Sequence, residues 1–286
     1  MRRKDVTCLK TKIKTPILVV LFICMVAGLI SCSEETPRLE QITNDFFKTI
    51  DTNAYVISPE DFIYQARSNP DLFIVDLREP EEYTESHIRY ALNIPWGMDL
   101  WANIDKIPYN KPVAVYADSE YLSMQATALL ALAGFQVKSV TAGWEEICFL
   151  DGMRDMKETG YNRFNQVPPP DIDPDLRVAL EQYFKKIDVL DRSMMDEFTV
   201  NIEDAVFMFE NKEEDKAFLC VDSASTDESP FQAVSVNIPF GPEMYFSFEN
   251  LRLEQYILVY GTNTQEVVFT MMWLQMLGFD AVIIQL

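Results

Sequence analysis

The sequence has 286 residues and a formal net charge of −21. A chain this negative repels nucleic acids and anionic substrates, so we expect no nucleic-acid partner, and oxyanion chemistry would need a local positive pocket. There is one histidine, His87, and no Cys-x-x-Cys pair, so the usual metal-ligand spacings are excluded and we expect neither a metal nor a cofactor.

Residues 1–31 have the pattern of a targeting segment. Basic residues precede an uninterrupted apolar run of 14 residues, Ile17–Ile30. This run is short for a bilayer span and typical of a signal-peptide core. Its end, Leu29-Ile30-Ser31-Cys32, resembles the bacterial lipobox, in which the cysteine is diacylated and becomes the first residue of the mature protein. The alternative is a plain signal anchor with an incidental cysteine.

We therefore expect Cys32 to carry a lipid that anchors the chain to a membrane of the bacterial cell envelope. Ser33, rather than an aspartate, follows the cysteine and favours the outer membrane, with a periplasmic or a surface orientation left open. Removal of residues 1–31 takes away six basic residues and one acidic residue and leaves a net charge of −26. Residues 32–52 would then form a tether and an N-terminal helix.

A long internal repeat organises the rest of the chain. Three motifs recur after 144 residues: Asn93-Ile94-Pro95 as Asn237-Ile238-Pro239, Val115-Tyr116 as Val259-Tyr260, and Gly134-Phe135 as Gly278-Phe279. Upstream, Phe73–Asp76 recurs as Leu219–Asp222 after 146 residues. A period this long is the size of a whole domain. The sequence therefore predicts one fold written twice, over residues 53–150 and 176–286.

Each copy reads as alternating strands and helices. In the first, the pattern predicts a helix over 38–50, strands over 72–75, 112–117 and 135–140, and helices over 79–87 and 123–133. In the second, it predicts a helix over 174–190, strands over 217–221, 256–260 and 281–284, and a helix over 266–277. Continuous apolar strands interleaved with helices indicate an α/β fold with a parallel sheet. Residues 151–175, which include Pro168-Pro169-Pro170, are predicted to be a Pro-rich linker.

The first copy closely resembles the rhodanese-like domain family over about residues 53–148. The resemblance rests on five motifs in family order: Val75–Tyr83, His87-Ile88, Ala91–Pro95, Lys111–Tyr116, and Gly134-Phe135 leading to Gly143-Trp144. The second copy resembles the family mainly through the inherited spacing. The resemblance implies two rhodanese-like domains, each a five-stranded, mostly parallel sheet flanked by helices. Thiosulfate and mercaptopyruvate sulfurtransferases have such a tandem arrangement.

The resemblance directs attention to the loop after each Val-Tyr pair. In active members a cysteine follows this pair and opens a Cys-x-x-Gly-x-Arg-Ser loop that holds the transferred sulfur. Here the two loops read Ala117, Asp118, Ser119, Glu120, Tyr121, Leu122, Ser123 and Gly261, Thr262, Asn263, Thr264, Gln265, Glu266, Val267. Alanine and glycine have no nucleophilic atom, so we expect no catalytic residue in either loop.

Other candidates have structural interpretations. By family position we expect Asp76 and Arg78 to form an internal ion pair or hydrogen bonds near the former active-site mouth, rather than to act in catalysis. We expect His87 to orient the loop that follows its helix. Cys148 and Cys220 are expected to be thiols without a disulfide. Trp96 and Trp101 would either line a binding surface or pack in the core.

Two functional hypotheses remain. The first is a catalytically inactive tandem rhodanese-like lipoprotein that serves as a binding or scaffold module for an unidentified envelope protein or peptide. The alternative is a sulfurtransferase of the thiosulfate or mercaptopyruvate type with a relocated cysteine such as Cys148. The missing nucleophile, base and arginine favour the first.

Overall fold

The computed structural model describes residues 38–163, 167–168, 170–188, 198–211, 215–222, 230–242 and 244–285. Residues 39–286 belong to one compact unit. The expected signal segment and Cys32 lie outside the described residues. In the part of the chain that is described, no helix combines the length and the apolar character needed to cross a membrane.

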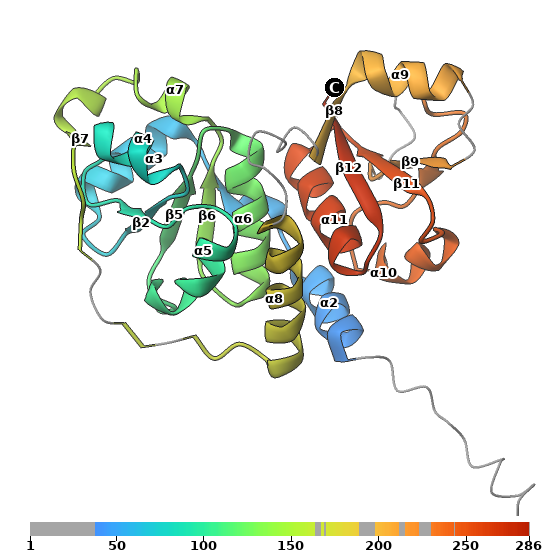
Figure 1. Ribbon diagram of the computed structural model, residues 1–286, viewed down its shortest axis with the longest axis horizontal. Coiled ribbons are helices and arrows are strands. Elements are labelled where there is room, and N and C mark those ends of the chain that lie inside the picture. Colours follow the sequence, from blue (N-terminus) through green and yellow to red (C-terminus); the bar gives the residue numbers. More distant parts are fainter. Residues whose placement is uncertain are drawn as a thin grey trace, which may run out of the picture. The chain divides into compact units, whose positions relative to one another are not determined.

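The first repeat contains a five-stranded parallel sheet (Figure 1). Its strands are β1 (Val56–Ile57), β2 (Phe73–Asp76), β4 (Leu92–Asn93), β5 (Val113–Tyr116) and β6 (Val137–Val140), in the spatial order β1-β6-β5-β2-β4. Asp76 lies opposite Tyr116 in the register. The carboxyl ends of β2 and β5 therefore meet at one edge of the sheet.

The helices that precede, connect and follow these strands are mostly short. They are α2 (Arg38–Thr49), η1 (Thr52–Tyr55), α3 (Pro59–Ser68), α4 (Pro80–Glu85), α5 (Met98–Ala102), η2 (Ile104–Lys106), α6 (Glu120–Leu132), α7 (Trp144–Ile147) and η3 (Met153–Asp155). The predicted helix over 123–133 starts three residues earlier, at Glu120, because the Ser119 hydroxyl caps it by accepting a hydrogen bond from the Leu122 N–H at 3.2 Å.

The second repeat has the same topology. Its strands are β8 (Thr199–Asn201), β9 (Lys216–Cys220), β10 (Val236–Asn237), β11 (Tyr256–Tyr260) and β12 (Asp280–Gln285), all parallel in the order β10-β9-β11-β12-β8. Its helices are α8 (Pro174–Asp188), α9 (Ile202–Glu210), α10 (Met244–Ser247), η5 (Phe248–Asn250) and α11 (Thr264–Met276). The order matches that of the first sheet strand for strand, and the predicted fold class, two five-stranded parallel sheets flanked by helices, is confirmed.

Helices α6 and α11 lie against each other at the centre of the protein. Nearly every residue of both is buried, which is typical of a helix that is apolar all round. Each packs on the sheet of its own repeat and on the other helix. One core cluster therefore contains residues of both repeats.

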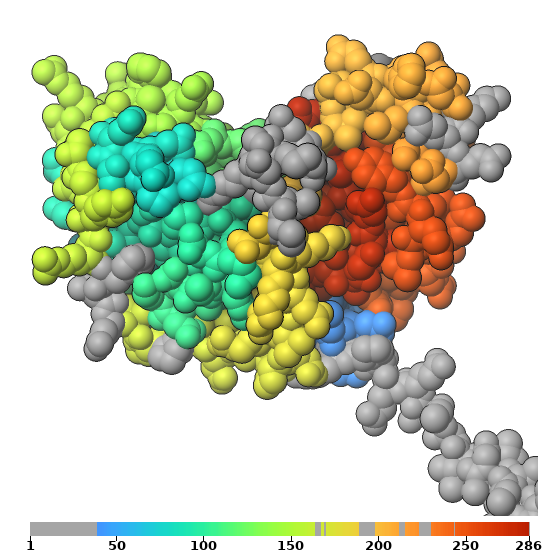
Figure 2. All heavy atoms as spheres, viewed as in Figure 1, coloured from blue at the N-terminus to red at the C-terminus, as the bar shows by residue number. Residues whose placement is uncertain are grey.

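The two leading helices pack across the two repeats. Phe46 and Phe47 of α2, which precedes the first sheet, contact Phe269 and Trp273 of α11 in the second repeat. Conversely, α8 contacts α5 of the first repeat as well as α11. In Figure 2, α8 (yellow) lies between green residues of the first repeat and red residues of the second.

The packing of α8 on the first repeat involves the two tryptophans that follow Asn-Ile-Pro in that repeat. Trp96 and Trp101 both pack on Phe184 of α8. Their ring centroids lie 5.8 and 5.9 Å, respectively, from the ring centroid of Phe184. Trp96 is buried and Trp101 half-buried. Of the two roles considered for these residues, core packing is the one observed.

The first half of the predicted linker contains regular structure. Strand β7 (Lys157–Glu158) pairs antiparallel with β3 (His87–Ile88), and the side chains of Met153 and Met156 are buried in the first repeat. The sequence pattern missed this because a two-residue strand has no periodicity to detect. Residues 151–163 thus extend the first repeat rather than separating it from the second.

Candidate functional site

The loop that follows β5 begins at a buried residue, Ala117. The Ala117 side chain is fully buried, and the Ala117 carbonyl accepts a hydrogen bond from the Trp144 N–H at 2.9 Å. A Cβ atom at Gly143 would overlap the Asp118 carbonyl, so glycine permits the close approach of these two segments. The position at which the family resemblance puts a nucleophile therefore faces the core.

Arg78 and Asp76 form a buried ion pair, as the sequence predicted. The Arg78 guanidinium donates to both Asp76 oxygens, Nε to Oδ1 at 3.0 Å and Nη2 to Oδ2 at 2.6 Å, and Nη2 also donates to the Ser86 carbonyl. The guanidinium carbon lies 4.0 Å from the ring centroid of Trp144. Because only 2% of the Arg78 side chain is exposed, this charge is committed internally and not offered to an incoming anion.

Tyr116 completes this cluster. Its hydroxyl donates to Asp76 Oδ2 at 2.5 Å and accepts from the Ile88 N–H at 3.3 Å. Burial and the neighbouring carboxylate of Asp76 raise the pKa of the Tyr116 phenol well above its usual value. The phenol therefore stays protonated and acts as a structural donor.

His87 lies in β3, which forms a two-stranded antiparallel sheet with β7. Its ring stacks on Tyr83 with centroids 3.8 Å apart, Nδ1 is 2.8 Å from the Tyr83 carbonyl oxygen, and Nε2 is 3.4 Å from Asn162 Nδ2. These contacts connect α4 to the chain beyond β7. His87 thus helps hold this part of the first repeat together.

The loop after β11 is filled by its own neighbours. A Cβ atom at Gly261 would lie 2.7 Å from Val221 Cγ2 and 2.8 Å from Asp222 Oδ1. The Asp222 carboxylate accepts hydrogen bonds from the N–H and the hydroxyl of Thr262, at 2.8 and 3.1 Å. Asn263 Oδ1 accepts from the Gln265 and Glu266 amides and so caps α11. The backbone N–H groups of the loop and of the start of α11, which could otherwise bind an anion, therefore donate to side chains of the protein itself.

Both loops carry a carboxyl group with a raised pKa. Burial and the charge of Glu146 raise the pKa of Glu120, and burial and the charge of Asp222 raise that of Glu266. Negative charge at these two helix starts disfavours an oxyanion there.

The two loops border cavities that share one residue. A cavity of about 120 Å³ is lined by Ser119, Tyr121, Leu122, Gln125, Phe198, Thr199 and Gln285. A second, of about 290 Å³, is lined by Tyr121, Gly261, Thr262, Thr264, Val267, Ile283 and Ile284. Tyr121 of the first repeat thus reaches the loop of the second. Among the described residues that line them, there is no lysine or arginine.

Asp222 and Tyr121 carry roles here that the sequence did not assign. Asp222 stands where Asp76 stands in the first repeat, so the repeat offset was a usable signal for it. For Tyr121 there was no such sequence signal, because its role comes from packing between the repeats. Among the described residues neither remaining cysteine forms a disulfide: Cys148 is half-buried, with Sγ 3.2 Å from the Glu145 carbonyl, and Cys220 is buried in β9.

Residues 59–149 match the family model of the rhodanese-like domain. Comparison with curated proteins gives no match. Among solved structures, a thiosulfate sulfurtransferase from Pseudomonas aeruginosa is 15% identical, with a TM-score of 0.38, and the match covers 86% of this chain and 45% of that one. The chain thus spans about half the length of that protein.

Two further solved structures are similar. The 3-mercaptopyruvate sulfotransferase SseA from Escherichia coli is 14% identical, with a TM-score of 0.36, and the match covers 81% of this chain and 97% of that one. The BH2092 protein from Bacillus halodurans is 24% identical, with a TM-score of 0.32, over 37% of this chain and 78% of that one.

Proposed function

We propose that this chain, whose residues 59–149 match the rhodanese-like domain, is a catalytically inactive binding module of the bacterial cell envelope, held on a membrane by a lipid at Cys32. One observation carries the proposal. The residue after each Val-Tyr strand is Ala117 or Gly261, and neither has an atom that can carry sulfur.

The surroundings of these two residues support the proposal. Sulfur transfer by this fold family requires an accessible thiolate held in an anion-binding loop. Ala117 is fully buried, and Gly261 has no room for a Cβ atom because Val221 and Asp222 occupy the space. Neither position is a vacant site that one altered side chain would restore.

Charge supports it as well. An anionic sulfur donor requires a positive pocket in a chain of net charge −21. Arg78 is committed to Asp76 and Trp144, and the described residues that line the cavities beside the loops include no lysine or arginine. We propose instead that the cleft around Tyr121 contributes to binding an envelope protein or peptide.

No contact of Cys148 favours the alternative of a relocated nucleophile. Its Sγ lies against the Glu145 carbonyl, and Glu145 and Glu146 are its acidic neighbours in α7. A thiolate is stabilised by cations or by a helix N-terminus, and Cys148 follows the last residue of its helix.

A sulfurtransferase assay tests the inactivity. Residues 33–286, which include the whole compact unit, are incubated with thiosulfate and cyanide, alongside Cys148→Ser and Cys220→Ser variants and an active sulfurtransferase as positive control. We expect no thiocyanate above the uncatalysed rate. Production that either substitution abolishes would overturn the proposal and identify the relocated cysteine.

Labelling tests the anchor. The full-length chain, expressed in bacteria fed an alkyne-bearing fatty acid, should incorporate the label, and the Cys32→Ser variant should not. Label retained in Cys32→Ser would exclude Cys32 as the attachment point. Crosslinking through a photoreactive residue at Tyr121 in the native envelope would then identify the binding partner.

A further inference from the structure

A cavity of about 670 Å³ opens in the second repeat, away from the loops described above. It is bordered by the end of α9, the start of β9, β10 and the segment that precedes β11. Lys216 is the first residue of β9 and Gln255 directly precedes β11, whereas the loops follow the carboxyl ends of the strands. The cavity is therefore a separate site, and its volume lies within the usual range for small-molecule pockets.

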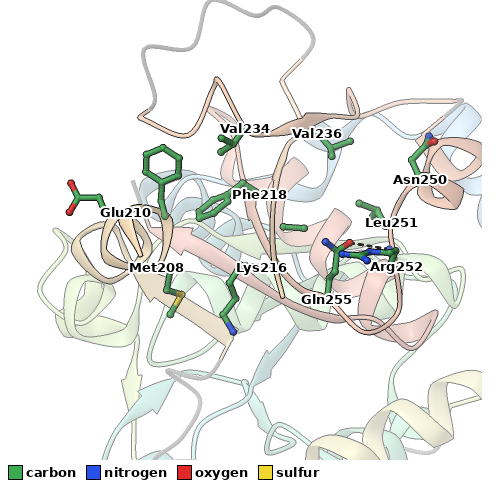
Figure 3. Close-up of a pocket in the computed structure, with 12 residues that line it drawn as sticks. Met208, Glu210, Lys216, Phe218, Val234, Val236, Asn250, Leu251, Arg252 and Gln255 are labelled. Carbon is green, nitrogen blue, oxygen red and sulfur yellow. Dashed lines mark hydrogen bonds between the residues drawn. The ribbon is translucent and has the colours of Figure 1, made fainter. Parts of the chain in front are cut away.

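Most of the lining is apolar. Figure 3 shows Phe218, Val234, Val236 and Leu251 around the opening. Phe218 and Leu251 are buried, whereas Val234 and Val236 are 52% and 36% exposed. The wall thus combines an ordered apolar floor with a rim that an apolar ligand would cover.

The internal repeat provides a matched comparison. Leu92 of β4 is the counterpart of Val236 of β10, 144 residues earlier, and each lies in the strand at the same edge of its sheet. Leu92 is 7% exposed and Val236 is 36% exposed. The same position is covered by protein in the first repeat and exposed in the second, so this exposure is particular to the second copy.

One end of the cavity is polar and positive. Arg252 and Gln255 meet there in Figure 3, where the Gln255 side-chain oxygen accepts a hydrogen bond from the Arg252 backbone N–H at 3.3 Å. The described residues give the Arg252 guanidinium no carboxylate partner. Lys216 is engaged differently, because its Nζ lies 3.1 Å from Asp215 and 4.8 Å from the ring centroid of Tyr256.

Among the described residues that line the cavity, the acidic one is Glu210, which lies at the opposite side and points away from the cavity in Figure 3. The cavity is thus mostly apolar and has positive charge at one end, in a protein whose overall charge is −21. An anion entering against that field needs a local cation, and Arg252 supplies one.

We infer that this cavity binds a small amphipathic carboxylate, such as a medium-chain fatty acid. The acyl chain lies along Phe218, Val234 and Val236, and the carboxylate pairs with the Arg252 guanidinium. Apolar contact provides affinity, and the charge pair orients the ligand and discriminates against neutral analogues. This site is independent of the proposed inactivity of the two loops.

Titration of residues 33–286 with dodecanoate, below its micelle concentration, tests the inference by calorimetry. We expect saturable binding with one site. Arg252→Gln should weaken the binding of dodecanoate by about tenfold or more and leave the affinity for 1-dodecanol unchanged, because only the acid pairs with the guanidinium. The matched control is Arg154→Gln, an exposed arginine in η3 of the first repeat, which should change neither.

A second variant tests the location. Val234→Trp places a large ring in the opening at a half-exposed position and should abolish binding of both ligands, with an unchanged circular dichroism spectrum showing that the fold is kept. The inference is overturned if dodecanoate does not bind, if Arg252→Gln weakens acid and alcohol equally, or if Val234→Trp binds normally. Binding of an apolar peptide with a free C-terminus in place of dodecanoate would also overturn it.

Discussion

The Asp222 carboxylate holds Thr262 by two hydrogen bonds, one from its backbone N–H and one from its hydroxyl. The counterpart in the first repeat, Asp76, pairs instead with Arg78 and Tyr116. The reason is local: Arg78 follows Asp76 by two residues, whereas Ala224 follows Asp222. The same aspartate position therefore has different partners in the two repeats. In the second repeat its carboxylate contacts the loop after β11.

Replacing Asp222 should therefore destabilise the second repeat. Asp222→Ala leaves the Thr262 N–H without its partner, and we expect a loss of about 1–2 kcal/mol in the free energy of unfolding, measured in urea. Asp71→Ala is the control, because Asp71 makes an exposed ion pair with Lys111 and should cost less than about 0.5 kcal/mol. Equal effects would show that the Thr262 contacts are not stabilising.

Adding a side chain at Gly261 should be harmful even when it supplies a nucleophile. Gly261→Cys forces a Cβ atom against Val221, and we expect a cost of about 1–3 kcal/mol and no thiocyanate production. Gly261→Ala combined with Val221→Ala should cost less than the sum of the two single changes, because Val221→Ala removes the closest atom. A Gly261→Cys protein of normal stability would contradict the crowding.

Substitutions in the buried ion pair of Arg78 and Asp76 should change the free energy of unfolding strongly and non-additively. Arg78→Met leaves the Asp76 carboxylate buried without its partner, and we expect a loss of about 3–5 kcal/mol by chemical denaturation. Asp76→Asn combined with Arg78→Met should cost less than the sum of the single changes, since no charge is then stranded. Arg154→Met, on the surface, should be nearly neutral. Strict additivity would show that the pair is not coupled.

The raised pKa values of Glu120 and Glu266 predict a pH dependence. A carboxyl group with a raised folded-state pKa destabilises the fold when ionised, and the penalty disappears as pH falls through that pKa. Glu120→Gln should therefore raise the free energy of unfolding at pH 7, on the order of 0.5 kcal/mol, and give no gain below about pH 4. Glu249→Gln, at an exposed position, is the control substitution. A gain that persists in acid would have another origin.

The three inner strands of each sheet and the central helices could be predicted because their signals are local, whereas the outer strands β1, β4, β8 and β10 and the helices α3 and α9 were not predicted. The apolar runs ending at Asp76 and Tyr116, and those of the second copy, became strands, and the Ala- and Leu-rich run after Ser123 became α6. Boundaries shifted where a cap decided them, as at Ser119 and Asn263. Strand β7 was missed because its pairing with β3 joins short segments 70 residues apart.

The sequence by itself determined the duplication, the α/β class and the residues that stand in the two loops, because repeats, hydrophobic runs and residue identities are properties of the chain alone. Only the tertiary structure decided that α2 and α8 pack across the repeats, that Asp222 holds the second loop, and that Val236 is open where Leu92 is covered. Each of these depends on which atoms meet after folding, and residues far apart in the chain carry no local pattern for that contact.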